Sequence, residues 1–300
     1  MMYLIFSSAV LLPMLLVVVG LLIWRFLRSL DRRRAPFNIQ LVNLPGDGLR
    51  RRIARHEEKL LDFSGMISVA GPTFLALWLL ARIDKTGIDW TKIRFGMGDL
   101  MFVVVLGAML AFALWRMIHH ARARRRALDG LHAELAVAQC LTPLIAEGAM
   151  VFHDVPANGF NLDHVVVAPG AVFAIETKSR RKPAERGKAS ARVRYDNQQL
   201  FFPQHTEIKP IEQADYQARW LESYLREGGI EQVRVIPVVA LPGWYVDSEK
   251  SVFPRVLVNN CTNSSFMLRI GSGTPLPQSV RKSIGQLITH RYPSPAEPRP

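Results

Sequence analysis

The chain contains little cysteine and few acidic residues relative to basic ones. Only Cys140 and Cys261 are cysteines among 300 residues, and neither belongs to a C-x-x-C motif or a Cys/His cluster. We therefore expect no structural zinc site, and two buried, reduced thiols in a cytosolic domain. Asp and Glu number 25 against 38 Lys and Arg, giving a net charge of +13. This surplus favours an anionic partner, either nucleic acid or anionic lipid.

Long apolar runs occupy much of the first 118 residues. Residues 2–24 suffice, at about 1.5 Å per residue, to cross a hydrocarbon core of about 30 Å. No basic residue precedes this run and no small-residue cleavage pattern follows it, so we expect a retained span and not a signal peptide. Residues 64–81 and 99–118 are predicted as a second and a third span. Gly71-Pro72 is expected to kink the second.

Arginines follow the first and third predicted spans: Arg25, Arg28, Arg32, Arg33 and Arg34, then Arg116, Arg122, Arg124, Arg125 and Arg126. The positive-inside rule places both groups in the cytoplasm. We therefore expect a bacterial-type inner (plasma) membrane protein with three spans, an external amino terminus and a cytoplasmic carboxyl-terminal domain. The segment between the first two spans, residues 35–63, is predicted as an arginine-containing connection. Its arginines are either a topology signal, which we favour, or a contact with anionic lipid.

The stretch from Asp163 to Lys178 is predicted to organise the rest of the chain. Two β-branched apolar runs flank Pro169-Gly170, which indicates two antiparallel strands joined by a tight turn, with proline presetting φ and glycine supplying a positive one. Asp163 opens the first strand and Lys178 closes the second. Because side chains alternate along a strand, Glu176 and Lys178 project from one face. Two carboxylates and a lysine are thus expected at one end of a sheet.

This combination is typical of phosphodiester hydrolysis. Mg²⁺ is commonly held by one or two carboxylates together with water and substrate phosphate. A lysine beside the metal can orient or deprotonate the attacking water and stabilise charge on the phosphate. Charged residues at strand ends also form ordinary surface ion pairs, however, so the residues alone leave both interpretations open.

The order of residues along this region resembles the nuclease-related domain (NERD) family, which is assigned to the PD-(D/E)XK nuclease-like superfamily. The resemblance covers roughly residues 128–258 and rests on Glu134, Gly159 to His164, Pro169 to Lys178, and Pro210 to Gln213. It implies that Asp163 and Glu176 are metal ligands and that Lys178 is the catalytic lysine. It further implies that Glu134 and Gln213 complete the site. One departure is Lys209, where the family commonly has asparagine before the proline.

The surrounding sequence predicts an α/β domain in which a mixed β-sheet is flanked by helices, as in restriction endonucleases. His164 is expected to point away from Asp163 and to be structural. The domain boundaries are predicted at 1–118 for the membrane region, 119–290 for the cytosolic domain and 291–300 for a disordered tail. The predicted elements are helices at 129–146, 211–226 and 279–288, and strands at 149–155, 192–195, 200–202, 233–241 and 254–258, with 192–195 and 200–202 extending the sheet.

A dense basic patch follows the predicted catalytic lysine: Arg180, Arg181, Lys182, Arg186 and Lys188. Beside a metal site, such a patch would bind a phosphate backbone without reading the base sequence. A run of charged residues is, however, usually just a solvent-exposed loop. Its position favours nucleic acid.

Together these features predict a membrane-anchored nuclease that uses Mg²⁺ or Mn²⁺. We expect nucleic acid and the lipid bilayer as partners and favour DNA over RNA, although no residue decides between the two. Two alternatives remain. One is a catalytically inactive module that tethers nucleic acid or a protein partner to the membrane. The other is that the positive charge contacts only the anionic lipids of the membrane.

Overall fold

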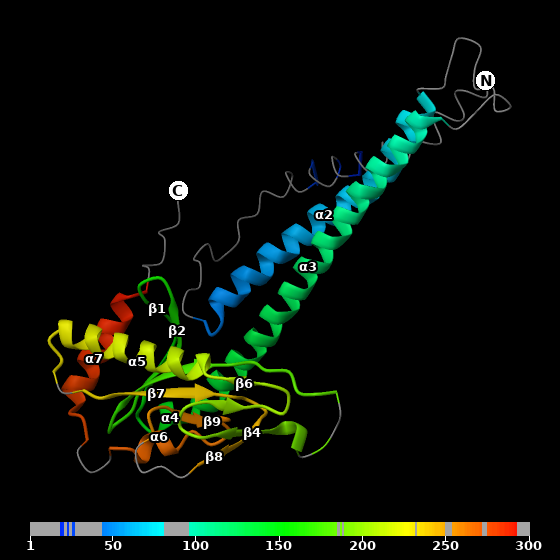
Figure 1. Cartoon of the computed structure of the whole chain (residues 1–300). Helices are drawn as coiled ribbons and strands as arrows, with labels where there is room; N and C mark the ends of the chain where they lie inside the picture. Colours follow the sequence, from blue (N-terminus) through cyan, green and yellow to red (C-terminus); the bar gives the residue numbers. More distant parts are fainter. Residues whose placement is uncertain are drawn as a thin grey trace. The chain divides into compact units, whose positions relative to one another are not determined.

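The computed structural model describes residues 44–80, 96–184, 187, 189–231, 233–249, 254–271 and 275–292, with a few positions between 19 and 27 (Figure 1). The chain divides into two compact units. One comprises residues 1–38 and 54–125, and the other comprises residues 39–53 and 126–300. Each unit is described by itself.

The first unit is helical where the structure describes it. Helices α2 (Asp47–Leu80) and α3 (Met97–Leu141) are long and apolar enough to cross a membrane, which by itself is weak evidence of insertion. They contain the predicted spans 64–81, apart from its last residue, and 99–118. The predicted span 2–24 lies almost wholly outside the described residues. Large apolar side chains are exposed along α3, at Leu100, Met101, Phe102, Val103, Val104, Val105, Phe112, Leu114 and Trp115.

Both helices extend beyond the predicted spans. The connection expected at 35–63 is wrong from Asp47 onward, because α2 already begins there. Arg, Leu, Glu and Ala, all strong helix formers, dominate the segment after Gly48 and favour this early start. Helix α3 joins the predicted third span and the helix that carries Glu134 into one element. It ends at Leu141, and the short α4 (Pro143–Ala146) follows where Pro143 has no N–H to continue the ladder.

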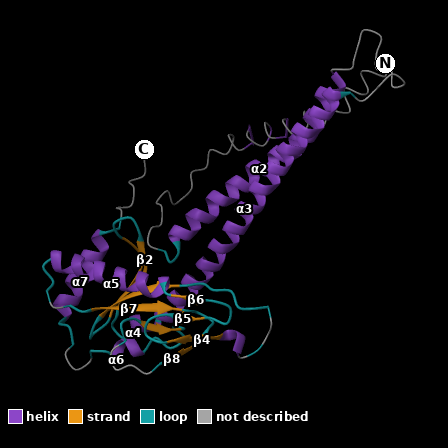
Figure 2. Cartoon of the chain, in the orientation of Figure 1, coloured by secondary structure: helices purple, strands orange, loops and turns teal. Residues whose placement is uncertain are grey.

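The second unit is a mixed α/β fold with helices on both sides of its main sheet (Figure 2). Its remaining helices are α5 (Lys209–Glu227), α6 (Phe266–Arg269) and α7 (Gln278–His290), with a 3₁₀ turn at Ala189–Ala191. Its strands are β1 (Met150–Pro156), β2 (Asn161–Val167), β3 (Val172–Thr177), β4 (Arg192–Tyr195), β5 (Leu200–Phe201), β6 (Thr206–Glu207), β7 (Val235–Ala240), β8 (Tyr245–Ser248) and β9 (Leu257–Asn259).

Five strands form the main sheet in the order β1-β2-β3-β7-β9. The first three pair antiparallel, whereas β3, β7 and β9 pair parallel. Helix α5 precedes β7 in the long connection from β3, as parallel pairing requires. The predicted mixed sheet flanked by helices is therefore confirmed for this unit.

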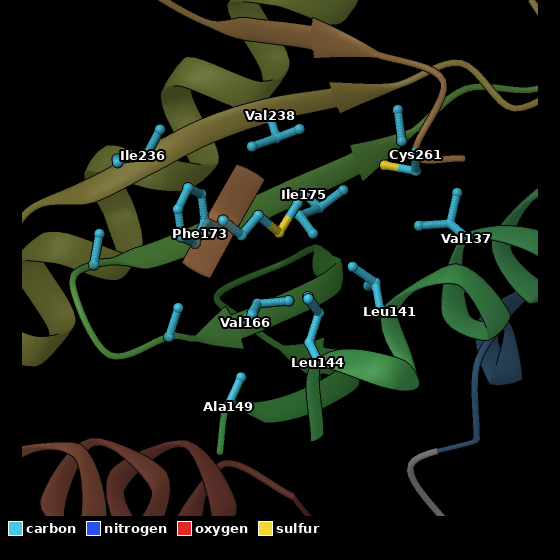
Figure 3. Packing of buried hydrophobic residues seen from close by; sticks show 14 residues of the cluster. Val137, Leu141, Leu144, Ala149, Val166, Phe173, Ile175, Ile236, Val238 and Cys261 are labelled. Carbon is cyan, nitrogen blue, oxygen red and sulfur yellow. The ribbon is translucent and has the colours of Figure 1, made fainter. Parts of the chain in front are cut away.

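Alternating residues of the central strands build two separate cores. On one face, Phe173 and Ile175 of β3 pack with Leu141 and Leu144 from the end of α3 and from α4 (Figure 3). On the other face, Val172 and Ala174 of β3 pack with residues of α5 and α7, namely Ala218, Leu221, Leu225, Ile284 and Ile288. The sheet is thus covered on both faces, which explains the nearly continuous apolar runs in the sequence.

The expectation that 192–195 and 200–202 extend this sheet is wrong. Strands β4 and β5 belong to a second, four-stranded sheet with the order β6-β5-β4-β8. Strand β3 already has β2 on one edge and β7 on the other, so no edge of it is open to the next strand in the chain. The second sheet has its own core, in which Val193, Tyr195 and Leu200 pack with Ile211 and Ala214 of α5 and with Leu241, Trp244 and Val256.

The tight turn at Pro169-Gly170 is present, but glycine has a different role from the one predicted. The Ala168 N–H donates to the Ala171 carbonyl over 3.0 Å, which closes the turn. Gly170 is not among the described residues with positive φ. A Cβ atom at this position would lie 2.3 Å from the Ile270 carbonyl oxygen and 2.5 Å from the Gly271 carbonyl carbon. Glycine is required here because another backbone segment approaches closely.

Candidate active site

A cavity of about 770 Å³ opens at the end of the main sheet where β2 begins and β3 ends. All of its lining residues belong to the second compact unit. They come from the first turns of α2, the later part of α3, the β1–β2 hairpin, the end of β3 and the start of α5. The cavity brings together all five predicted metal and catalytic residues: Glu134, Asp163, Glu176, Lys178 and Gln213.

The hairpin positions the two predicted metal ligands side by side. His164 pairs with Ile175 across β2 and β3, so the same register places Asp163 opposite Glu176. Asp163 Oδ2 accepts a hydrogen bond from the Thr177 N–H over 2.7 Å. Strand β2 begins at Asn161, two residues earlier than predicted, and Asp163 therefore lies within the strand and not at its start.

Lys178 lies where sequence alternation predicts, on the same face as Glu176. Its ammonium donates to Glu176 Oε1 and, over 2.9 Å, to Gln213 Oε1. The Glu176 side chain is 4% exposed and that of Lys178 is 19% exposed. Gln213 thus reaches from the first turns of α5 to the lysine, which agrees with its predicted place beside the site.

One site residue was not predicted from the sequence. Gln217 is buried and its Nε2 donates to Glu176 Oε2 over 2.5 Å. It follows Gln213 by four residues, and residues at this spacing share a helix face. This spacing was the available signal. With Gln217 and Lys178 bound, both oxygens of Glu176 accept a hydrogen bond from a protein side chain.

Glu134 approaches the same cavity from α3. The pKa of its carboxyl group is raised to about 7 by burial and then by the negative charges of Asp154 and Glu176. The positive charges of Lys178 and Arg50 oppose this rise and are smaller effects. The pKa of Asp163 is raised well above its ordinary value, chiefly by burial and then by Glu176 and Glu134, against the Thr177 hydrogen bond. The three carboxylates therefore repel one another in a poorly hydrated space.

Asp154 fixes one wall of the cavity. Its Oδ2 accepts a hydrogen bond from the Gly48 N–H at the start of α2 over 2.9 Å, and its Oδ1 accepts one from Asn161 Nδ2 over 2.8 Å. Asp154 also has a φ of 47°, a conformation that costs free energy for a residue other than glycine. The contacts with Gly48 and Asn161 maintain it and join α2 to the β1–β2 hairpin.

His164 is structural, as predicted. It is buried on the opposite face of β2 from Asp163, and its Nδ1 lies 2.8 Å from Nδ1 of His153 on β1. Burial, and then the neighbouring His153, lower the pKa of His164 to about 3, so the imidazole is neutral. It therefore takes no part in the cavity.

The predicted nucleic-acid-binding residues are only partly at the cavity. Arg180 and Arg181 line it, but Arg180 forms a two-bonded ion pair with Glu207, and Arg181 pairs with Asp129. Lys182 lies over the ring of Trp244, 5.8 Å from its centre. Arg186 and Lys188 lie outside the described residues. Two further arginines that the site prediction omitted, Arg52 and Arg126, line the same cavity.

One known family matches part of this unit. Residues 129–242 match the family model of the nuclease-related domain, NERD. The matched segment runs from the end of α3 through β7 and contains all five predicted metal and catalytic residues. Membership in the PD-(D/E)XK nuclease-like superfamily is consistent with this match. Comparisons with curated proteins and with solved structures found no match to the chain.

The donor set of this NERD segment suits a hard divalent cation. Carboxylate oxygens, and the amide oxygens of Asn161 and Gln213, are among the groups that line the cavity, and no cysteine or histidine lines it among the described residues. Among all the residues that the structure describes, no three acidic, histidine or cysteine side chains are close enough to form a complete metal site. Mg²⁺ typically uses one or two carboxylates and keeps several waters, so Asp163 and Glu176 fit it. Each Glu176 oxygen retains a second lone pair despite its hydrogen bond.

Proposed function

We propose that the second unit is a metal-dependent nuclease that hydrolyses phosphodiester bonds of nucleic acid. The observation that carries this proposal is the convergence of Asp163, Glu176 and Lys178 in one cavity within the segment that matches the nuclease-related domain. Asp163 and Glu176 would hold Mg²⁺ or Mn²⁺. The bound cation would polarise the scissile phosphate and lower the pKa of a bound water.

The side chains of the chain itself supply the remaining chemistry. Lys178 has three N–H donors, two of which bind Glu176 and Gln213, so the third is available for a phosphate oxygen whose negative charge grows in the transition state. Glu134, with a pKa of about 7, suits the role of proton acceptor for the attacking water near neutral pH. Gln213 and Gln217 position Lys178 and Glu176.

We further propose that the helices of the first unit, with residues 2–24, anchor the protein in the plasma membrane with the nuclease unit in the cytoplasm. The exposed apolar side chains of α3 and the arginines that follow them support this orientation. The anchored protein will remain in the membrane pellet after extraction at alkaline pH. Release into the supernatant would contradict the anchor.

A cleavage assay tests the nuclease. The full-length protein would receive labelled single- and double-stranded DNA and RNA with Mg²⁺ or Mn²⁺, beside Glu176→Gln, Lys178→Ala and the control Arg192→Ala, whose side chain lies on the second sheet. We expect the two site variants to lose at least about a hundredfold in rate and the control to keep it. Equal cleavage by all four proteins would assign the activity to a contaminant.

A specific contact also favours a second function. The ammonium of Lys178 can neutralise Glu176 in place of a cation, as in a site that has kept its fold and lost its chemistry. In that case the unit would tether nucleic acid or a protein partner to the membrane. Binding of nucleic acid without cleavage, unchanged by Glu176→Gln and Lys178→Ala, would support this alternative over the nuclease.

A further inference from the structure

Four aromatic side chains form a continuous strip beside the cavity. This aromatic strip consists of Phe160, Tyr216, Trp220 and Tyr224. The ring centre of Phe160 lies 5.5 Å from that of Tyr216 and 5.5 Å from that of Trp220. Trp220 and Tyr224 are parallel, with an angle of 2° between their planes and 5.5 Å between their centres. These separations are typical of interacting rings.

The strip begins at the candidate active site. Phe160 itself lines the cavity. Tyr216 and Trp220 each follow, by three residues on α5, a glutamine that contacts the site, Gln213 or Gln217. Residues three apart are neighbours on a helix surface, so the aromatic row lies directly beside the row that contacts the site. A ligand in the cavity could therefore continue onto the strip.

Phe160 is held firmly at this position. It closes the β1–β2 hairpin, where its carbonyl accepts a hydrogen bond from the Ala157 N–H over 2.8 Å, and Gly159 adopts the φ of 86° that the turn needs. Arg291 binds the Pro156 carbonyl and Asn158 Oδ1 of the same hairpin. Its guanidinium also covers Trp220 and Tyr224, at 5.5 and 5.4 Å from their ring centres.

Packing explains only part of the strip. Phe160, Trp220 and Tyr224 are half-buried and contact the core between the main sheet and helices α5 and α7. Tyr216 is 55% exposed, contacts Phe160 through its ring and is not part of that core. An exposed aromatic residue in contact with a ring that lines a polar cavity is instead suited to stacking on a ligand that extends from that cavity.

We propose that Phe160 and Tyr216 form a stacking platform for the unpaired bases of a single-stranded nucleic acid whose backbone enters the cavity. Aromatic side chains stack on any base whose face is free, whereas in a duplex neighbouring base pairs cover both faces. Arg52 and the third N–H of Lys178 are placed at the cavity to contact backbone phosphates. This inference rests on the proposed nuclease function and specifies its substrate as single-stranded DNA or RNA, or an unpaired end.

A binding experiment without catalysis tests the platform. Fluorescence anisotropy would measure binding of the full-length protein, in EDTA, to labelled oligo(dT), oligo(U) and a DNA duplex of equal length. The variants are Tyr216→Ala, Tyr216→Phe and Phe160→Ala. Tyr245→Ala is the matched control, because Tyr245 is 60% exposed and lies on β8, outside the residues that line the cavity. Thermal melting would verify that each variant folds.

We expect single strands to bind more tightly than the duplex, and Tyr216→Ala to weaken single-strand binding about tenfold. Tyr216→Phe keeps the ring and should stay within about twofold of the wild type, as should Tyr245→Ala. Phe160→Ala should weaken single-strand binding in the same way as Tyr216→Ala. Binding of the duplex should not depend on Tyr216.

Two results would overturn the platform: a duplex that binds as tightly as a single strand, or a Tyr216→Ala variant that binds single strands like the wild type. Because binding is measured without metal, the outcome is separate from catalysis. Single-strand binding that depends on Tyr216 in a protein that cuts nothing would uphold the platform and reject the nuclease. Cleavage that depends neither on Tyr216 nor on whether the substrate is single- or double-stranded would uphold the nuclease and reject the platform.

Discussion

Two sets of ion pairs, one in each sheet of the second unit, differ sharply in their surroundings. Between β4 and β8, Arg192 pairs with Asp247, and beyond the strand Arg194 pairs with Glu249, each with both side chains at least half exposed. At the end of β3, Lys178 pairs with Glu176, whose side chain is 4% exposed. The first set has one arginine for each acid, whereas the second shares its lysine among several carboxylates.

This difference is the one expected between an ordinary surface and a functional site. An exposed ion pair contributes little to stability and can be lost without consequence. A buried pair costs desolvation energy, and beside it burial, and then like-charge repulsion, raise the pKa values of Asp163 and Glu134. Folding alone gives no reason for such an arrangement. Perturbed carboxyl groups at a cavity are instead typical of catalytic centres.

The largest difference in the free energy of unfolding should appear when the basic side chain of each set is replaced by methionine. At pH 8 in EDTA, Lys178→Met should reduce the free energy of unfolding of the full-length protein by about 3 kcal/mol, because it leaves a buried carboxylate without its counter-charge. Arg194→Met should cost less than about 1 kcal/mol, since Glu249 remains hydrated. Denaturation with urea measures both. Equal losses would show that burial does not separate the two sets.

The pH dependence of Glu134 should give a smaller effect. Its pKa is raised from an ordinary 4.5 to about 7, so between these values the folded state holds a proton that the unfolded state has lost. The stability from this group is present below about pH 4.5 and is lost as the pH rises to about 7. We expect the melting temperature of the wild type, relative to Glu134→Gln, to fall across this range in EDTA and to level off above it.

The comparison with Glu134→Gln removes the titrations that do not depend on Glu134. His153 and His164 also have lowered pKa values, but they are present in both proteins and their contribution cancels. Mg²⁺ should raise the melting temperature of the wild type more at pH 8 than at pH 6, because a cation competes with protons for the carboxylates. A pH-independent difference between the two proteins would contradict the raised pKa of Glu134.

Much of the hairpin was predictable because it depends on local pattern. Two β-branched runs around Pro169-Gly170 predict two paired strands, and alternation places Glu176 and Lys178 on one face, as their hydrogen bond confirms. The role of Gly170 was not predictable. It depends on the approach of residues 270 and 271, which are a hundred residues away in sequence, and no local signal reports such a contact.

In the site and in the second sheet, too, features set by local pattern were predictable and those set by distant contacts were not. Glu134 and Gln213 were located by resemblance to a family, whereas Gln217 required knowledge of which face of α5 meets β3. Strands β4 and β5 were recognised by composition, but their sheet was not, because pairing depends on which edges remain open after β7 docks on β3. Arg180 and Arg181 form ion pairs with distant acids that a charge count along the chain does not show.

Binding of Mn²⁺ tests most directly whether Asp163 and Glu176 form a metal centre. Isothermal titration calorimetry of the full-length protein would compare the wild type with Asp163→Asn and with Asp247→Asn, which removes an exposed acid of the second sheet. We expect Mn²⁺ binding that Mg²⁺ displaces, that Asp163→Asn weakens at least about tenfold and that Asp247→Asn leaves unchanged. A wild-type protein that binds no Mn²⁺, or an Asp163→Asn variant that binds it equally well, would contradict a metal centre at Asp163 and Glu176.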